Sequence, residues 1–268
     1  MPAMALRTAP WPAGVPCWVD ITVPDVEASS AFYAAVLGWT VPPAGEHSGG
    51  YRVAEVDGAA VAGIGPLQAG EHTAWTLYLA SDDAGATAAA ITEHGGTLLV
   101  APDDVGSNGR MAIAQDPTGA VFGVWQAGTM IGAGLVNEPG ALVWEDLRST
   151  DPGTAQAFYR SVFGYDVSPL EMAGPDYVTF SLPGGDAPLG GMGGMMGGPE
   201  GVPSHWLSYF AVADADAAAA AAGAAGGRVV VPPFDTEFGR MGGLMDPDGA
   251  VFWIAQPPEG APQPDRSA

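Results

Sequence analysis

The sequence contains no lysine, one cysteine and only four histidines among its 268 residues. Eight arginines stand against thirty acidic residues, which gives a formal net charge of −22. Such a charge repels phosphate backbones and anionic lipid, so we expect no nucleic-acid partner and no membrane partner. The lack of lysine also excludes the phosphate-binding Gly-x-x-x-x-Gly-Lys loop.

Long apolar runs and disulfide pairs are missing as well. The single cysteine, Cys17, has no partner for an internal disulfide, which is typical of a reducing compartment. No stretch approaches the ~20 consecutive apolar residues of a membrane helix, and the first ten residues lack the apolar core of a signal peptide. We therefore expect a soluble cytoplasmic protein.

What the sequence does contain is an internal repeat. Residues 18–126 (copy one) align with residues 144–256 (copy two). Each copy is long enough to bury its own core, so we expect domains at 14–127 and 141–257, a linker at 128–140 and a flexible tail at 258–268. The matched segments are Trp18–Thr22 with Trp144–Arg148, Ala31–Tyr33 with Ala157–Tyr159, Tyr51 with Tyr177, Trp75 with Trp206, and Asp116–Phe122 with Asp246–Phe252.

Within each copy, the apolar periodicity predicts two units in which a strand, a helix and two or three strands follow one another. Aspartates mark the helix starts, and glycines mark the helix ends. In copy one the expected strands are 18–23, 51–56, 60–65, 75–80, 97–101, 111–115 and 121–125, with helices beginning at Asp25 and Asp83. In copy two the expected helices are 151–163 and 214–225.

These motifs identify a family resemblance. A first strand, a helix ending in Phe-Tyr-x-x-Val-Leu/Phe-Gly-Trp/Tyr and a terminal Asp-Pro-x-Gly-Ala-Val-Phe hairpin resemble the vicinal oxygen chelate superfamily, which includes glyoxalase I, bleomycin-resistance proteins and extradiol dioxygenases. The two-domain arrangement is similar to tandem glyoxalase-like proteins often labelled hydroxylases. The resemblance implies an α+β fold of two such domains, each made of paired βαβββ modules whose curved mixed sheet encloses a cup-shaped cavity.

Metal-using members of this family hold a divalent ion with imidazole and carboxylate side chains. When their ligand positions are carried over, they fall on residues that are apolar, small or weak donors, so we expect no metal and no cofactor. These positions are Trp18, Thr76 and Gly123 in copy one, and Trp144, Leu207 and Trp253 in copy two.

Strand alternation predicts which side chains face each cup. Period two places Asp20 beside Trp18, and Asp146 and Arg148 beside Trp144. Asp146, Arg148 and His205, which lies just before the Trp206 strand, are the candidate catalytic groups. Ligand-binding residues are expected among Trp144, Tyr209, Trp253, Met192, Met195, Trp18, Asp20, Tyr78 and Trp125. The Gly- and Met-rich segment 190–201 is either a lid over an apolar ligand or a loose surface loop.

Three functions remain open at this point. The first is a metal-independent protein that acts on a small apolar or aromatic metabolite, in secondary metabolism or detoxification, with acid/base chemistry if it is an enzyme. The second is a drug- or metabolite-sequestering protein of the bleomycin-resistance type. The third is a scaffold whose cups are filled by its own side chains. Metal-dependent glyoxalase, lyase or dioxygenase activity ranks lower, and both a monomer and a homodimer fit the duplication.

Overall fold

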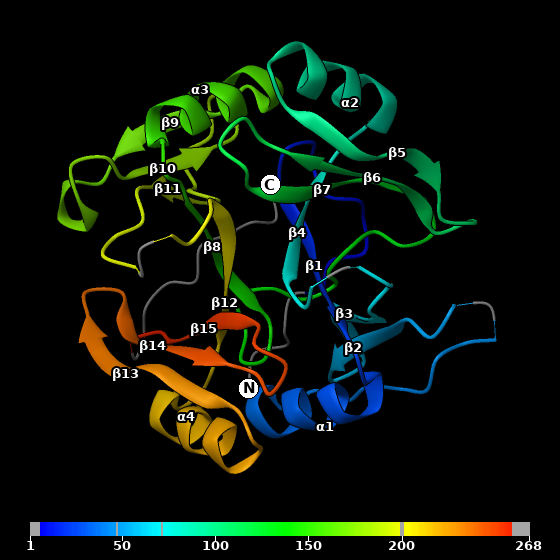
Figure 1. Ribbon diagram of the computed structural model, residues 1–268, viewed down its shortest axis with the longest axis vertical. Coiled ribbons are helices and arrows are strands. Elements are labelled where there is room, and N and C mark those ends of the chain that lie inside the picture. Colours follow the sequence, from blue (N-terminus) through cyan, green and yellow to red (C-terminus); the bar gives the residue numbers. More distant parts are fainter. Residues whose placement is uncertain (1–5, 47, 71, 199–200, 259–268) are drawn as a thin grey trace.

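The computed structural model describes residues 6–46, 48–70, 72–198 and 201–258. Copy one forms a seven-stranded mixed sheet and copy two an eight-stranded one, with two helices each (Figure 1). This confirms the predicted α+β class and the duplication of one mixed-sheet plan. Copy one comprises β1 (Pro16–Val23), α1 (Val26–Leu37), β2 (Arg52–Val56), β3 (Ala59–Pro66), β4 (Trp75–Ala80), α2 (Ala84–Glu93), β5 (Thr97–Asp104), β6 (Gly109–Gln115) and β7 (Val121–Ala127).

The elements of copy two follow the same order. They are β8 (Leu142–Arg148), α3 (Pro152–Phe163), β9 (Asp166–Pro169), a short 3₁₀ helix (Glu171–Ala173), β10 (Val178–Ser181), β11 (Gly190–Gly193), β12 (His205–Ala211), α4 (Ala215–Ala224), β13 (Arg228–Thr236), β14 (Gly239–Met245) and β15 (Val251–Gln256).

The four α-helices begin where the sequence predicts. Asp25, Asp83, Asp151 and Asp214 each accept hydrogen bonds from backbone N–H groups of the first helical turn, which otherwise lack partners. Gly38 ends α1 in the left-handed region, with φ of 74°. Among the described residues, no helix is long and apolar enough to span a membrane.

Strand order explains how each site is placed. In copy one the order is β2-β3-β1-β4-β7-β6-β5, and in copy two it is β13-β14-β15-β12-β8-β11-β10-β9. The first strands of the two modules, β1 and β4 or β8 and β12, are antiparallel neighbours at the centre. Side chains on one face of this central pair therefore come from both modules.

The copies differ in one strand. The first module of copy one has two strands after its helix, whereas the matching module of copy two has three. At the place of β9, copy one makes only an isolated bridge between Thr40 and Glu55. Pro42 and Pro43 follow at once, and because proline has no N–H, the ladder cannot continue. The two strands agree with those expected at 51–56 and 60–65.

The segment between the domains lies against copy one. The Ala133 N–H donates to the Cys17 carbonyl at 2.7 Å, the Gly134 N–H donates to the Ala60 carbonyl at 2.8 Å, and the Trp11 indole donates to the Ala133 carbonyl at 3.0 Å. The domain boundaries remain predictions, and residues 259–268 of the predicted tail lie outside the described residues.

The two domains meet through their repeated motifs. Phe32 and Tyr33 of α1 pack on Phe252 of β15, with ring centroids 6.3 and 5.5 Å apart. The Tyr33 hydroxyl donates to Asp246 at 2.9 Å, and Asp246 belongs to the turn before β15. The Phe-Tyr motif of copy one therefore docks on the Asp-Pro-x-Gly-Ala-Val-Phe hairpin of copy two.

The converse contact is also present. Phe158 and Tyr159 of α3 pack on Phe122 of β7, with ring centroids 6.1 and 5.4 Å apart. Burial raises the pKa of Tyr159, and the nearby Asp116 carboxylate raises it further. In Figure 1, α1 accordingly lies beside α4, and α2 beside α3. The chain thus closes on itself as a two-fold dimer of identical subunits would.

Tyr33→Phe tests this reciprocal docking. The substitution leaves a buried oxygen of Asp246 without its donor, so we expect the free energy of unfolding to fall by about 1–3 kcal/mol in urea titrations. Glu27→Gln, on the exposed side of the same helix, should change it by less than about 0.5 kcal/mol. Equal effects of the two substitutions would contradict the assignment.

Candidate functional site

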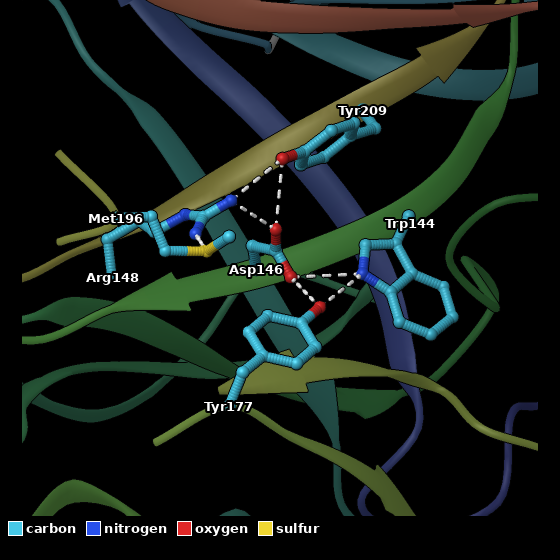
Figure 2. A network of polar contacts seen from close by, with 6 residues as sticks. All are labelled: Trp144, Asp146, Arg148, Tyr177, Met196 and Tyr209. Atoms are coloured by element: carbon cyan, nitrogen blue, oxygen red, sulfur yellow. Dashed lines mark hydrogen bonds and ion pairs between the residues drawn. The ribbon is translucent and has the colours of Figure 1, made fainter. Parts of the chain in front are cut away.

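The candidate site of copy two is built around Asp146 on β8. Trp144, Asp146 and Arg148 alternate along this strand on one face, and Tyr209 of β12 is paired with Trp144. The intervening Leu147 is fully buried in the hydrophobic core on the opposite face. Tyr177, just before β10, joins these four side chains, and Figure 2 shows all five together with Met196. We call Trp144, Asp146, Arg148, Tyr177 and Tyr209 the copy-two cluster.

Four side chains donate to the Asp146 carboxylate. Oδ1 accepts from Trp144 Nε1 at 3.0 Å and from the Tyr177 hydroxyl at 2.5 Å. Oδ2 accepts from Arg148 Nη2 at 2.6 Å and from the Tyr209 hydroxyl at 2.9 Å. A carboxylate has about four acceptor positions, so Asp146 is saturated. The residue is also 4% exposed, which leaves little room for a ligand to reach it.

Arg148 is the positive group of the cluster. Burial alone would lower its pKa, but Asp146 and then Tyr209 outweigh that effect, so the pKa is raised and the guanidinium stays charged. Nη2 donates to Asp146 and to Tyr209, whereas among the described residues the hydrogen-bond partner of Nη1 is the thioether sulfur of Met196. Thioether sulfur is a weak acceptor, so one edge of the guanidinium lacks a strong partner.

Met196 reaches Arg148 from the Gly- and Met-rich segment. It is 54% exposed, and its φ of 47° lies in the left-handed region, which is unfavourable for a residue with a side chain. The structure brings Met196 to the cluster rather than the predicted Met195. Met192 belongs to the core on the other face, where it is paired with Leu147.

Tyr177 and its counterpart Tyr51 were missed as site residues. Each lies across a glycine of the neighbouring strand: a Cβ at Gly191 would overlap the Tyr177 hydroxyl, and one at Gly63 would overlap the Tyr51 hydroxyl. Those glycines are paired with Asp146 and Asp20. The recurrence of Tyr51 as Tyr177, opposite a small residue, was the signal that could have identified them.

An aromatic wall continues from the copy-two cluster. Trp253 of β15 packs on Tyr209 with ring centroids 5.3 Å apart, and Phe234 of β13 meets Trp253 edge-on at 6.2 Å. Phe234 is 42% exposed, so the wall reaches the surface. Trp253 was expected here; Phe234 was not.

His205 lies at the edge of the cluster. It opens β12, is paired with Arg148 and is half-buried, and its Nδ1 is 2.8 Å from the Pro203 carbonyl oxygen. If Nδ1 carries the proton, Nε2 is free to accept one. The three predicted catalytic residues are therefore neighbours on one face.

Copy one holds a related cluster of Trp18, Asp20, Tyr51 and Tyr78. Trp18 Nε1 donates to the Tyr51 hydroxyl at 2.9 Å, and that hydroxyl donates to Asp20 at 3.1 Å. The Tyr78 hydroxyl lies near enough to Asp20 to lower the pKa of that carboxyl. Trp125, two residues after Gly123 on β7, donates through its Nε1 to the Met130 carbonyl at 2.9 Å.

The charge of this copy-one cluster differs from that of copy two. Thr22 occupies the position of Arg148, and none of the ion pairs among the described residues includes Asp20. Burial raises the pKa of Asp20 to about 7, although the hydrogen bonds from Tyr51 and Tyr78 lower it. The carboxyl therefore changes protonation near neutral pH.

Comparison with known proteins decides the family. Residues 17–124 and 141–254 each match the model of the glyoxalase/bleomycin resistance protein/dioxygenase superfamily. The chain belongs to this superfamily. Its resemblance to vicinal oxygen chelate proteins, inferred from the repeated motifs, is thereby confirmed.

Several relatives match over almost their whole length. The chain is 42% identical over 261 residues to “Putative glyoxylase CFP32” of Mycobacterium tuberculosis, covering 93% of this chain and 96% of that protein. It is 36% identical over 265 residues to the anthracycline biosynthesis protein DnrV of Streptomyces peucetius, covering 93% and 95%. The Mn(II)-bound glyoxalase of Novosphingobium aromaticivorans shares the fold, with a TM-score of 0.64, 18% identity and coverage of 91% and 83%.

The residues present do not fit the metal that many such proteins bind. Within the part of the chain that the structure describes, no three His, Cys, Asp or Glu side chains are grouped as a metal site. The tyrosines occupy the space beside the small residues at the family's ligand positions: a Cβ at Gly123 would overlap the Tyr78 ring. Asp146, the carboxylate on the cluster face of β8, already uses its acceptor positions on protein donors.

Arg148→Thr introduces into copy two the residue that copy one has. Asp146 would lose its buried counter-charge, so we expect the free energy of unfolding to fall by about 2–4 kcal/mol. The matched control is Arg240→Thr, which removes an ion pair with the exposed Asp216 and Asp235 and should cost less than about 1 kcal/mol. Similar losses in urea titrations would show that Arg148 is not a buried partner.

Asp20→Asn tests the protonation of copy one. The pKa of Asp20 is about 7 in the folded protein and 3.8 for an ordinary carboxyl, so protonation of Asp20 stabilises the folded state. This stabilisation is complete below the ordinary pKa and is lost as the pH rises through about 7. The unfolding free energy of the unmodified protein should therefore fall by about 2 kcal/mol between about pH 5 and pH 8, relative to that of the Asp20→Asn variant. Parallel curves for the two proteins would contradict the raised pKa.

Proposed function

We propose that the copy-two cluster and its aromatic wall bind a flat, largely apolar metabolite that carries a carbonyl or anionic oxygen, without the help of a metal ion. The observation that supports this most directly is the state of Arg148. Asp146 and Tyr209 hold one of its terminal nitrogens, while the other contacts only a thioether. A ligand oxygen that replaced the Met196 sulfur would form a charge-assisted hydrogen bond there.

The wall supplies the apolar part of this recognition. Tyr209, Trp253 and Phe234 form a continuous row of rings that runs from the buried cluster to the surface. Flat rings stack favourably on such side chains, and a few placed polar groups then fix the orientation. An aromatic ligand whose oxygen faces Arg148 satisfies both conditions.

The names of the relatives agree with an aromatic ligand. DnrV is named as an anthracycline biosynthesis protein, and anthracyclines are polycyclic aromatic quinones with several carbonyl and hydroxyl oxygens. We extend this only to the ligand class: an aromatic polyketide-like quinone in secondary metabolism. The glyoxylase name of the mycobacterial relative points to the same superfamily without specifying such a ligand.

The arrangement separates positioning from proton transfer. Asp146 accepts from four donors and is buried, so it orients Arg148 and has no acceptor position left for a substrate proton. His205 lies on the same face, paired with Arg148, and is the group suited to move a proton if the ligand is converted. Binding without turnover uses the same residues except His205.

Titration with 1,4-dihydroxyanthraquinone, followed by quenching of tryptophan fluorescence, tests the binding. Arg148→Thr should weaken it roughly 10- to 100-fold, because a charge-assisted hydrogen bond is lost. Met196→Ala should leave the affinity unchanged or raise it a few-fold, and Met195→Ala is its matched control. Unaltered affinity in Arg148→Thr, with the fold intact by circular dichroism, would refute the proposal.

Turnover distinguishes the enzyme from the sequestering protein. If the quinone is converted, mass spectrometry of the incubation should show a new product whose rate of formation falls at least about tenfold in His205→Asn, with little change in affinity. An unchanged ligand recovered at one equivalent per chain would instead support sequestration, the function of bleomycin-resistance proteins.

A further inference from the structure

The two clusters differ in how fully their central carboxylate is used. Asp146 receives four hydrogen bonds. Within the part of the chain that the structure describes, Asp20 accepts one hydrogen bond, from the Tyr51 hydroxyl, because Trp18 donates to that hydroxyl instead of to the carboxylate. The Tyr78 hydroxyl lies nearby and also lowers the pKa of Asp20. A carboxylate has about four acceptor positions, so Asp20 retains capacity for further donors.

Asp20 also lacks a counter-charge. None of the ion pairs formed among the described residues includes it, and the position equivalent to Arg148 is Thr22. The neighbouring strands place Gly63 of β3 and Thr76 of β4 opposite Asp20. The titratable groups facing it are therefore the hydroxyls of Tyr51 and Tyr78, and the described residues around it carry no positive charge.

The two aspartates also differ in exposure. Asp20 is half-buried, whereas Asp146 is only 4% exposed. Partly exposed apolar residues share its face of the sheet: Val53 is paired with Gly63, and Ile113 with Gly123, which is itself paired with Tyr78. A ligand donor at Asp20 would thus have apolar side chains beside it.

We propose that the copy-one cluster is a second ligand site, which binds the protonated amine of a small apolar or aromatic molecule through the Asp20 carboxylate. An ammonium group supplies both the donors and the charge that Asp20 lacks, and the tyrosine and tryptophan rings around it favour a cation. The raised pKa of Asp20 fits this site, because a bound cation restores the ionised form. The two copies then select ligand groups of opposite character.

Binding of 1-naphthylmethylammonium, measured by calorimetry at about pH 8, tests the site. We expect saturable binding that Asp20→Asn weakens at least about tenfold, and that Thr22→Arg abolishes by recreating the ion pair of copy two. Binding should be about tenfold weaker at about pH 6, where most of Asp20 is protonated and the amine remains charged. Shifts of the Gly63 and Gly65 backbone amide signals in NMR spectra would locate the ligand.

Two controls separate this site from the one in copy two. Arg240→Thr, which removes only an exposed ion pair of copy two with Asp216 and Asp235, should leave the affinity for 1-naphthylmethylammonium unchanged. The anionic 1-naphthoate should not bind at the copy-one cluster. The proposal is overturned by equal affinity in Asp20→Asn, by shifts of Gly63 with naphthoate, or by no saturable amine binding up to about 10 mM.

Discussion

The reciprocal docking of the two Phe-Tyr helices on the two Asp-Pro-x-Gly hairpins is the contact on which the rest of the structure depends. Tyr33 reaches Asp246 across the domain boundary, and the ring of Tyr159 lies against Phe122 in the converse pair. The helix side of each sheet is engaged in this way, and the opposite faces carry the two clusters. The same docking fixes the central strands, whose alternate residues build both clusters.

The repeat revealed the fold because its anchors are apolar and regularly spaced. Asp25, Asp83, Asp151 and Asp214 could be recognised as helix caps, since that function depends on the next few residues alone. The two strands after the first helix of copy one were predicted at 51–56 and 60–65, and Pro42 and Pro43 account for the absence of a third. The repeated motifs were expected to be architectural; that they bind each other across the domains required the structure.

The site was predictable where it follows from alternation along one strand. Trp144, Asp146 and Arg148 share a face for that reason, and Tyr209 joins them through the pairing of β8 with β12. Tyr177 precedes β10 and Met196 follows β11. Both contact the cluster from segments without strand alternation, so alternation does not predict their positions. Met192 was misplaced because a Gly-rich segment gives no clear alternation, and the register puts it in the core.

The closure of the two domains also has a consequence for how the chain is made. During synthesis, Phe32 and Tyr33 leave the ribosome long before Phe252, the ring on which they pack. Copy one therefore emerges with an aromatic surface that has no cover until the last strand of copy two has been synthesised. The N-terminal half depends on the C-terminal half to complete its surface, so maturation of the two domains is coupled although each has its own sheet.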